Sequence, residues 1–205
     1  AFDFDGTLAP IVARPADARL SQAVAARLAA LAERLPVAVV SGRSLADLRQ
    51  RLGFVPTYLV GNHGAEDADD PGAAATLRAA LDPLRRHLAS KQALLAAAGV
   101  TLEDKGLSLA LHHRLAPSQE AALAAIGAAL RDGPAGLSVF GGKRVVNLAP
   151  AGAPDKADAL RALVARSGAD TALFAGDDVN DEPAFERAPP HWLTLRVGRD
   201  AASRA

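Results

Sequence analysis

The sequence contains no cysteine and no methionine among its 205 residues, and only 4 % of the residues are aromatic. Without cysteine, the protein has no disulfide bond, no thiolate metal site and no cysteine nucleophile. The absence of methionine, with Ala1 directly before Phe2, predicts that a short segment precedes position 1 in the natural protein. We find no signal-peptide pattern, and we take a cytoplasmic location as the default expectation.

Two further absences bear on the partners of the protein. Lys and Arg together number 23, as do Asp and Glu, so the formal net charge is zero. A protein that binds nucleic acid needs a basic excess on some face, so we expect no nucleic-acid partner. The longest apolar run, residues 93–100, falls well short of the roughly 20 residues that span a membrane, so we expect no membrane partner either.

The pattern of hydrophobic residues predicts an α/β fold. Half of the residues are hydrophobic, which is enough to bury a sizeable core. Short apolar runs that end in turn residues predict buried strands over residues 37–40, 58–60 and 171–175. The alternating residues 1–4 predict the end of another strand, and we expect a final strand over residues 192–197. Helical patterns lie between them, with Ser21, Ser44 and Asp155 as candidate N-caps. Such alternation is typical of a Rossmann-like, doubly wound parallel sheet.

The middle of the chain has a different character. Polar, turn-rich breaks lie at residues 67–72 and 150–154. Between them we expect one long helix with a leucine stripe, a half-exposed strand over residues 107–115, a second helix and two more strands. This order is typical of an open-faced α+β lobe. We therefore predict a core of residues 1–66 and 150–205, with an α+β domain of residues 67–149 inserted in it.

Polar residues of an unusual kind follow the predicted core strands. Ligands of parallel sheets bind outside the carboxyl ends of the strands. The residues at these ends are Asp3, Asp5, Ser41, Asn62, His63, Asp177, Asp178 and Asp181. Two carboxylates about 4 Å apart repel by roughly 4 kcal/mol at an effective dielectric of ~20, so this cluster requires a cation. Oxygen ligands favour Mg²⁺, which typically bridges carboxylates to phosphate oxygens.

The residue types at these positions suit phosphoryl transfer. Asp3 and Asp5 lie two residues apart, so their side chains face the same side of an extended strand. One carboxylate can attack while the other transfers a proton. Ser41 and the N–H groups of a helix start can hold phosphoryl oxygens. Lys156 can add positive charge at the same place.

Four motifs, in the family's order, resemble those of the haloacid dehalogenase-like (HAD) phosphatases. They are Asp3-Phe4-Asp5-Gly6-Thr7, Ser41-Gly42-Arg43, Lys156 and Gly176-Asp177-Asp178-Val179-Asn180-Asp181-Glu182. The resemblance implies that Asp3 is the nucleophile, that Asp5 is the general acid and base, and that Ser41 and Lys156 bind the phosphoryl group. The Mg²⁺ ligands it implies are Asp3, the Asp5 carbonyl and Asp177, with support from Asp181 and Asp178. The inserted lobe lies where the family's C2-type caps are placed.

Three more stretches resemble the trehalose-6-phosphate phosphatases within that superfamily. They are residues 61–66, 105–114 and 142–150. The resemblance implies hydrolysis of trehalose 6-phosphate to trehalose and inorganic phosphate. We expect a monomer. The substrate-binding residues that the resemblance implies are Gly42, Arg43, Asn62, His63, Glu66, Lys105, His112, Arg114 and Asn147. If residues 112–114 are extended, His112 and Arg114 face one side, where both can meet a sugar phosphate.

Departures from this family keep other functions open. Asn147 stands where the family generally has Glu, and His113 replaces a Tyr. An amide both donates and accepts, whereas a carboxylate only accepts, so the substrate can be another sugar phosphate of the mannosylglycerate or sucrose type. A third hypothesis is a receiver-like signalling module that accepts a phosphoryl group. The inserted lobe and the position of the acceptor on the first strand oppose it.

Overall fold

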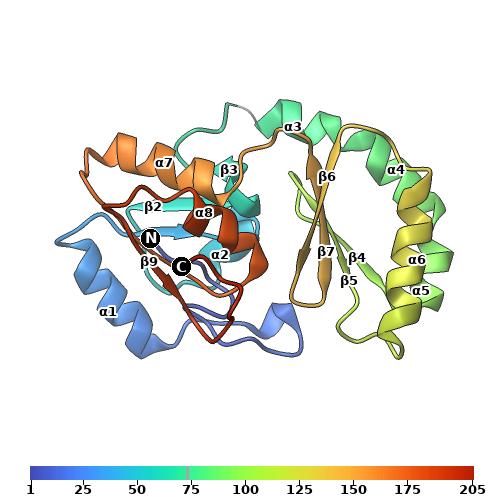
Figure 1. The fold of residues 1–205 in the computed structure, drawn as a ribbon, viewed down its shortest axis with the longest axis horizontal. Coiled ribbons are helices and arrows are strands. Elements are labelled where there is room, and N and C mark those ends of the chain that lie inside the picture. The colour runs from blue at the N-terminus through green and yellow to red at the C-terminus, as the bar shows by residue number, and fades with distance from the viewer. Residues whose placement is uncertain (73) are drawn as a thin grey trace. The chain divides into compact units, whose positions relative to one another are not determined.

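The computed structural model describes residues 1–72 and 74–205 and shows two compact units (Figure 1). Unit 1 comprises residues 1–71 and 154–205, and unit 2 comprises residues 72–153. These boundaries lie four or five residues beyond those proposed from the sequence. Glu66 and Asp67 pair with a strand of unit 1. At the other boundary, the N–H of Ala151 donates to the Gly136 carbonyl of unit 2 at 2.8 Å.

One mainly parallel sheet forms the centre of unit 1. In spatial order its members are β3 (Glu66–Asp67), β2 (Tyr58–Gly61), β1 (Ala38–Val40), the Phe2 segment, β8 (Leu173–Gly176) and β9 (Leu193–Arg196). Phe2 makes parallel bridges to Val39 of β1 on one side and to Ala175 of β8 on the other. It therefore joins the strands of the N-terminal segment to those of the C-terminal segment in one sheet. β3 alone is antiparallel to its neighbour. The predicted α/β fold with a parallel sheet is confirmed.

The first predicted strand is shorter than expected. Only Phe2 is bridged to both neighbours, because the chain turns directly after Asp3. The N–H groups of Leu8 and Ala9 both donate to the Phe4 carbonyl, which closes a tight loop. Gly6 lies in this loop at φ 86°, a conformation that side chains disfavour. The turn places Asp3 at the carboxyl end of the central strand position.

Helices cover both faces of this sheet. They are η1 (Pro15–Asp17), α1 (Gln22–Ala32), α2 (Leu45–Arg49), η2 (Asn62–Gly64), α7 (Lys156–Ser167), η3 (Val179–Asp181) and α8 (Glu182–Glu186). Val39 packs in one apolar cluster with residues of α2, and Val40 packs in another with residues of α7 and α8. Burial of each such side chain contributes about 1.5–3 kcal/mol. Ser21, Ser44 and Asp155 each accept a backbone N–H at a helix start, as predicted.

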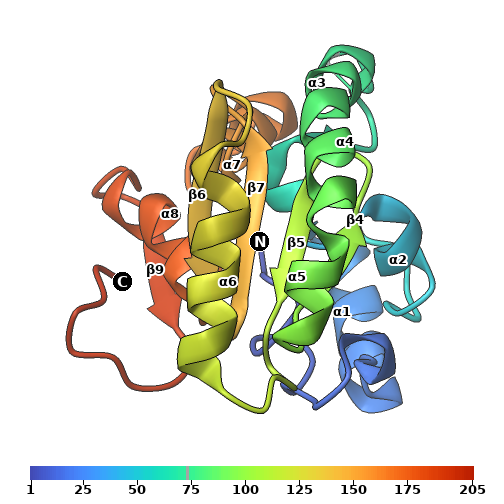
Figure 2. The same cartoon turned by 90° about the vertical axis from the view of Figure 1, so that its right-hand side faces the viewer.

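Unit 2 is a four-stranded antiparallel sheet with helices on one face (Figure 2). In spatial order the strands are β4 (Thr101–Asp104), β5 (Leu109–His112), β7 (Val145–Pro150) and β6 (Leu137–Gly142). The helices are α3 (Ala74–Ala80), α4 (Asp82–Ser90), α5 (Gln92–Ala97) and α6 (Gln119–Arg131). Leu84 and Leu88 of α4, Leu95 of α5 and Ile126 of α6 belong to one apolar cluster with Leu111 and Leu148 of the sheet. In the part of the chain that the structure describes, no helix has the length and apolarity to cross a membrane.

One expectation for unit 2 was wrong, and one strand was missed. The single long helix is divided into α3, α4 and α5, with a break at Leu81 and another at Lys91. Pro83 lies in the first turn of α4, where its missing N–H costs nothing, so a new helix begins there. β4 was not predicted, because its residues are exposed on an edge strand and show no apolar alternation.

Candidate active site

A buried cluster of three acids and one lysine lies at the carboxyl ends of the central strands of unit 1. The Lys156 Nζ donates to Asp3 Oδ1 at 2.7 Å and to Asp181 Oδ1 at 2.5 Å. Asp177 belongs to the same group, because one carboxylate oxygen from each of Asp3, Asp177 and Asp181 lies within 4.8 Å of the others. All four residues are 4 % exposed or less. The structure therefore brings together residues 3, 156, 177 and 181, as predicted.

Burial and charge shift the pKa values of this cluster in opposite directions. Desolvation raises the pKa of Asp3 to about 8, although the ammonium of Lys156 lowers it in part. Burial alone lowers the pKa of Lys156, but the charges of Asp3 and Asp181 outweigh it and the pKa is raised. Lys156 is therefore charged at neutral pH. Once Asp3 has lost its proton, three carboxylates around one ammonium leave an excess of negative charge that a cation would neutralise.

Two glycines leave space for the acids. A Cβ at Gly6 would lie 1.8 Å from an oxygen of the Asp177 carboxylate, and a Cβ at Gly176 would lie 2.4 Å from the Asp181 carboxyl carbon. The second oxygen of Asp181 accepts from the N–H groups of Asp177 and Asp178 at 2.8 and 2.9 Å. The Asp178 carboxylate instead accepts from the Val179 N–H and the Asn180 amide. It lies outside the group of three acids, so its predicted metal role has only an indirect basis in the structure.

The second predicted catalytic acid, Asp5, is held by an arginine. The Arg43 Nε and one terminal nitrogen donate to the two oxygens of Asp5 at 2.6 and 2.7 Å. The guanidinium also donates to Asp47 at 2.6 Å and stacks on the Phe4 ring at 5.4 Å. Arg43 thus connects Asp5 to Asp47 at the start of α2, and its substrate contact stays a prediction. Ser41 follows β1, is 1 % exposed, and its hydroxyl oxygen accepts the Arg43 N–H.

Residues 62–66 are bonded to the chain segment that follows β1. Oε2 of Glu66 accepts from the Asn62 amide at 2.7 Å and from the Leu45 N–H at the start of α2 at 2.8 Å. The N–H of His63 donates to the Ser41 carbonyl at 2.9 Å. His63 is thus bonded to Ser41, and Glu66 joins Asn62 to the start of α2. In this structure they support the loop that Ser41 begins.

The predicted sugar-binding residues of unit 2 lie on and beside β5 and β7. His112 ends β5, and its Nε2 is 2.6 Å from Glu103 Oε2 of β4. Arg114 donates to the Lys143 carbonyl at 3.1 Å, and the Lys105 N–H donates to the Ser108 carbonyl at 2.9 Å. Asn147 lies in β7 opposite Ala110 and is 1 % exposed.

The expectation that His112 and Arg114 share one strand face was wrong. β5 ends at His112, so the alternation of an extended strand does not reach Arg114. The His113 carbonyl accepts from the Ala116 N–H and from the Gln119 side chain. These bonds turn the chain toward α6.

A family model described as trehalose-phosphatase matches residues 1–201 of this chain. The chain belongs to the trehalose-phosphatase family. An "uncharacterized glycosyl hydrolase" of Mycobacterium tuberculosis is 42 % identical over 90 % of this chain, which covers 15 % of that protein. A trehalose-phosphate phosphatase of Mycobacterium marinum is 34 % identical over 96 % of this chain, which covers 53 % of that protein. The chain therefore spans about half or less of these curated relatives.

Two solved structures agree with the family and the fold. A crystal structure described as a trehalose-6-phosphate phosphatase related protein is 25 % identical, with a TM-score of 0.77 over 97 % of this chain and 86 % of the other. The C-terminal domain of a Candida albicans trehalose-6-phosphate phosphatase is also 25 % identical. Its TM-score is 0.72, over 90 % of this chain and 71 % of the other. The trehalose-phosphatase fold thus extends over nearly the whole chain.

The acid cluster of this trehalose-phosphatase chain suits a divalent cation. Its donors are carboxylate oxygens in mutual reach, and hard divalent cations prefer oxygen donors. Gly6 lets the Asp177 carboxylate lie directly against the Asp3–Gly6 turn, because a Cβ at position 6 would overlap that carboxylate. The donor chemistry, the mutual reach of the three carboxylates and the excess negative charge all fit a divalent ion.

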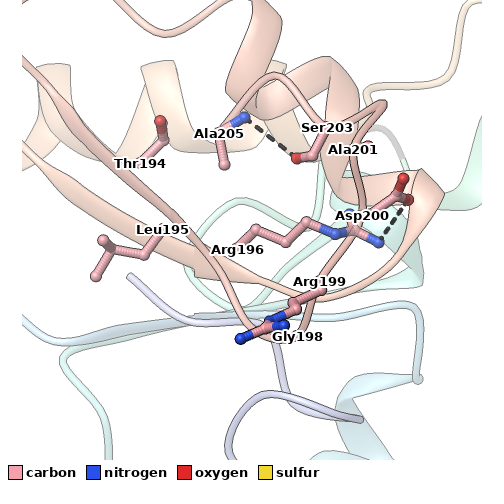
Figure 3. A pocket seen from close by; sticks show the side chains of 9 residues that line it. All are labelled: Thr194, Leu195, Arg196, Gly198, Arg199, Asp200, Ala201, Ser203 and Ala205. Carbon is pink, nitrogen blue, oxygen red and sulfur yellow. Dashed lines mark hydrogen bonds and ion pairs between the residues drawn. The ribbon is translucent and has the colours of Figure 1, made fainter.

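Two cavities of unit 1 lie away from this cluster. One, of about 590 Å³, is lined by residues between Thr194 and Ala205, where Arg196 pairs with Asp200 at 3.1 Å (Figure 3). The other, of about 780 Å³, is mainly apolar and lies between Ala1, Leu35 and Trp192. Among the described residues that line these two cavities, none was predicted as a site residue.

The sequence did not reveal Arg187, which binds the N-cap of α7. Arg187 pairs with Asp155 and, at 3.0 Å, with Asp158. Asp155 is the N-cap directly before Lys156, so this pair fixes the helix start that carries the lysine. Arg187 is 32 residues from Asp155, and no local pattern in the sequence connects them.

Proposed function

We propose that the protein is a Mg²⁺-dependent phosphatase that hydrolyses trehalose 6-phosphate to trehalose and inorganic phosphate. The observation that carries this proposal is the Asp3–Lys156–Asp181 cluster at the carboxyl ends of the strands, with Asp177 in reach. Family membership supports the substrate. The trehalose-phosphate phosphatases of Mycobacterium carry this name over a region that this chain matches.

The chain's own residues account for both halves of the reaction. An oxygen of Asp3 attacks phosphorus, the bond from phosphorus to the sugar oxygen breaks, and an aspartyl-phosphate forms on Asp3. Asp5 gives its proton to the leaving sugar oxygen. Asp5 then takes a proton from water, which attacks phosphorus and releases phosphate from Asp3. Because Arg43 binds both oxygens of Asp5, this ion pair must loosen when Asp5 becomes protonated.

Positive charge around the phosphoryl group lowers the barrier. Lys156 carries one charge at a buried position, where electrostatic interactions are stronger than in water. The Ser41 hydroxyl and the N–H groups that follow it hold the phosphoryl oxygens. Mg²⁺ would be held by Asp3, the Asp5 carbonyl, Asp177 and Asp181, with Asp178 as a supporting neighbour. When bound, it neutralises charge on the phosphoryl oxygens.

The residues of unit 2 serve substrate choice in this proposal. Lys105, His112, Arg114 and Asn147 contact the sugar, and charged or amide groups of this kind bind hydroxyl and phosphate oxygens. We further propose a monomer that acts on a small-molecule sugar phosphate in the cytoplasm.

Asn147 supports a second candidate, a phosphatase for another sugar phosphate. Within residues 1–72 and 74–205, neither the Nδ2 nor the Oδ1 of Asn147 has a hydrogen-bond partner, although both atoms are buried. A buried amide without partners costs about 1–3 kcal/mol, which a bound hydroxyl group would offset. An amide both donates and accepts, so it is compatible with hydroxyl groups in more than one orientation.

Phosphate release from a panel of sugar phosphates tests both candidates. We expect the highest kcat/KM with trehalose 6-phosphate, and loss of turnover when Mg²⁺ is removed by a chelator. The Asp3→Asn variant should fold as the wild type does but lose essentially all turnover, because an amide is no nucleophile. The Asp69→Asn variant, which changes an exposed acid of unit 1, is the matched control and should stay active. Higher activity on a sucrose- or mannosylglycerate-type phosphate would select the second candidate, and activity retained by Asp3→Asn would refute the mechanism.

A further inference from the structure

Three consecutive residues between β2 and β3 have positive φ angles. The values are 48° at Asn62, 60° at His63 and 121° at Gly64. Such a conformation costs about 1–3 kcal/mol at each non-glycine residue and persists only where the surroundings enforce it. All three residues are buried. The contacts that hold this Asn62–Gly64 loop in its strained conformation therefore indicate its role.

One side of the Asn62–Gly64 loop is hydrogen-bonded to the Ser41–Arg43 segment. The N–H of His63 donates to the Ser41 carbonyl at 2.9 Å, and the N–H of Asn62 donates to the Arg43 carbonyl at 2.8 Å. Between these two bonds the imidazole lies against Gly42. A Cβ at Gly42 would be 2.3 Å from Cε1 of the ring, so the ring occupies the space of the missing side chain.

The other side of the loop meets the start of α7. A Cβ at Gly64 would lie 2.2 Å from the Asp155 carbonyl oxygen, so the two backbones are in direct contact. Asp155 is the N-cap of α7, and Lys156 follows it. A single strained loop therefore contacts both segments that hold the phosphoryl group in the proposed reaction.

We propose that the Asn62–Gly64 loop is a positioning element for the phosphoryl group. In this proposal the His63 ring fixes the backbone position of Gly42, and Gly64 fixes the position of the first residues of α7. This inference rests on the proposed phosphatase function. It assigns His63 a role through Gly42, in place of the sugar contact that the family resemblance implied. A misplacement of about 1 Å in such a site can cost roughly 100-fold in rate, so small shifts of the loop matter.

A pair of substitutions tests the contact between the ring and Gly42. Gly42→Ala places a methyl group into the ring, and we expect kcat to fall by about 100-fold. His63→Asn removes the ring but keeps a residue type that tolerates positive φ. In the Gly42→Ala/His63→Asn double variant the methyl group has space, so kcat should recover by about tenfold or more over Gly42→Ala. The losses should be equal for trehalose 6-phosphate and p-nitrophenyl phosphate, because both present the same phosphoryl group.

Binding of vanadate with Mg²⁺, measured by calorimetry, gives a readout that needs no turnover. Gly42→Ala should weaken vanadate binding, and the double variant should regain it. Gly64→Ala should weaken it too, whereas Gly168→Ala should lower only the melting temperature. Gly168 also has a positive φ, 67°, but no atom outside its chain neighbours lies within 4 Å of its Cβ position.

Two results would overturn the positioning role. One is a double variant that binds vanadate no better than Gly42→Ala. The other is a His63→Asn loss confined to trehalose 6-phosphate, which would mean that the ring contacts the sugar. If the wild type binds vanadate but releases no phosphate from trehalose 6-phosphate, the proposed substrate fails, and the variants' vanadate affinities still decide the role of the loop.

Discussion

At the scale of single residues, the chemistry depends on an ammonium buried between two carboxylates. Lys156 is 2 % exposed and binds both Asp3 and Asp181. Removal of one partner from a buried ion pair typically costs about 3–5 kcal/mol, because the remaining charge stays in a place without water. The cluster is thus stable only as a set, and its extra negative charge makes it responsive to both protons and cations.

The pKa of Asp3 predicts how protons and Mg²⁺ compete. Its pKa is raised to about 8 in the folded protein, against about 3.9 in an unfolded chain. Between these values the folded state holds the extra proton, so without a cation stability falls as pH rises toward about 8. Mg²⁺ replaces that proton, so its stabilising effect should grow over the same range. Melting temperatures at pH 6 and pH 8.5, with and without Mg²⁺, measure this effect.

The Asp3→Asn variant is the control for that experiment, since an amide neither titrates nor binds Mg²⁺ well. Its melting temperature should lose most of the Mg²⁺ dependence at both pH values. A Mg²⁺ shift in the wild type that is equal at the two pH values would contradict the assignment of the raised pKa to Asp3.

At the scale of elements, the first residues of two helices position the residues of the site. Ser44 caps α2, which follows the Ser41–Arg43 segment, and Asp155 caps α7 directly before Lys156. Both caps were predictable, because their side-chain type and the apolar spacing after them are local features. The division of the long helix and the edge strand β4 were not predicted, because they depend on packing with distant segments rather than on local spacing.

A cap substitution at α7 separates stability from positioning. Asp155→Ala removes the hydrogen bonds to Ala157 and Asp158 and the ion pair with Arg187. We expect the unfolding free energy to fall by about 0.5–2 kcal/mol and kcat to fall as well, because the start of α7 moves with Lys156. Ser21→Ala is the matched control, since Ser21 caps α1, away from the acid cluster. Urea unfolding and kcat measurements on both variants test this prediction, which fails if the two variants lose the same stability and both keep full activity.

At the scale of the whole molecule, the two units differ in the functional residue types that they contain. Unit 1 holds the acids and the lysine, and unit 2 holds the basic and amide residues proposed to contact the sugar. The two units have separate apolar cores. The core of unit 2 consists of buried side chains between Leu81 and Leu148. This division predicts that substitutions in the two units affect different steps.

Arg114→Ala in unit 2 is expected to lower kcat/KM for trehalose 6-phosphate by about tenfold or more, the loss typical of a charged hydrogen bond to substrate. The same variant should keep most of its activity on p-nitrophenyl phosphate, which has no sugar. Arg131→Ala, at an exposed position in the last turn of α6, serves as the control and should change neither value. Equal losses on both substrates would argue against a role for Arg114 in sugar recognition.

The sequence by itself determined the parallel α/β sheet, the helix caps and the group of Asp3, Lys156, Asp177 and Asp181. Apolar runs, turn residues and strand ends are local, and parallel strands place their carboxyl ends at one edge. Only the tertiary structure decided that Arg43 binds Asp5, that Arg187 holds Asp155, and that the His63 ring lies against Gly42. Each of these contacts joins residues 20 or more positions apart, and the physical reason is that their side-chain directions are set by packing in three dimensions, which local sequence spacing does not encode.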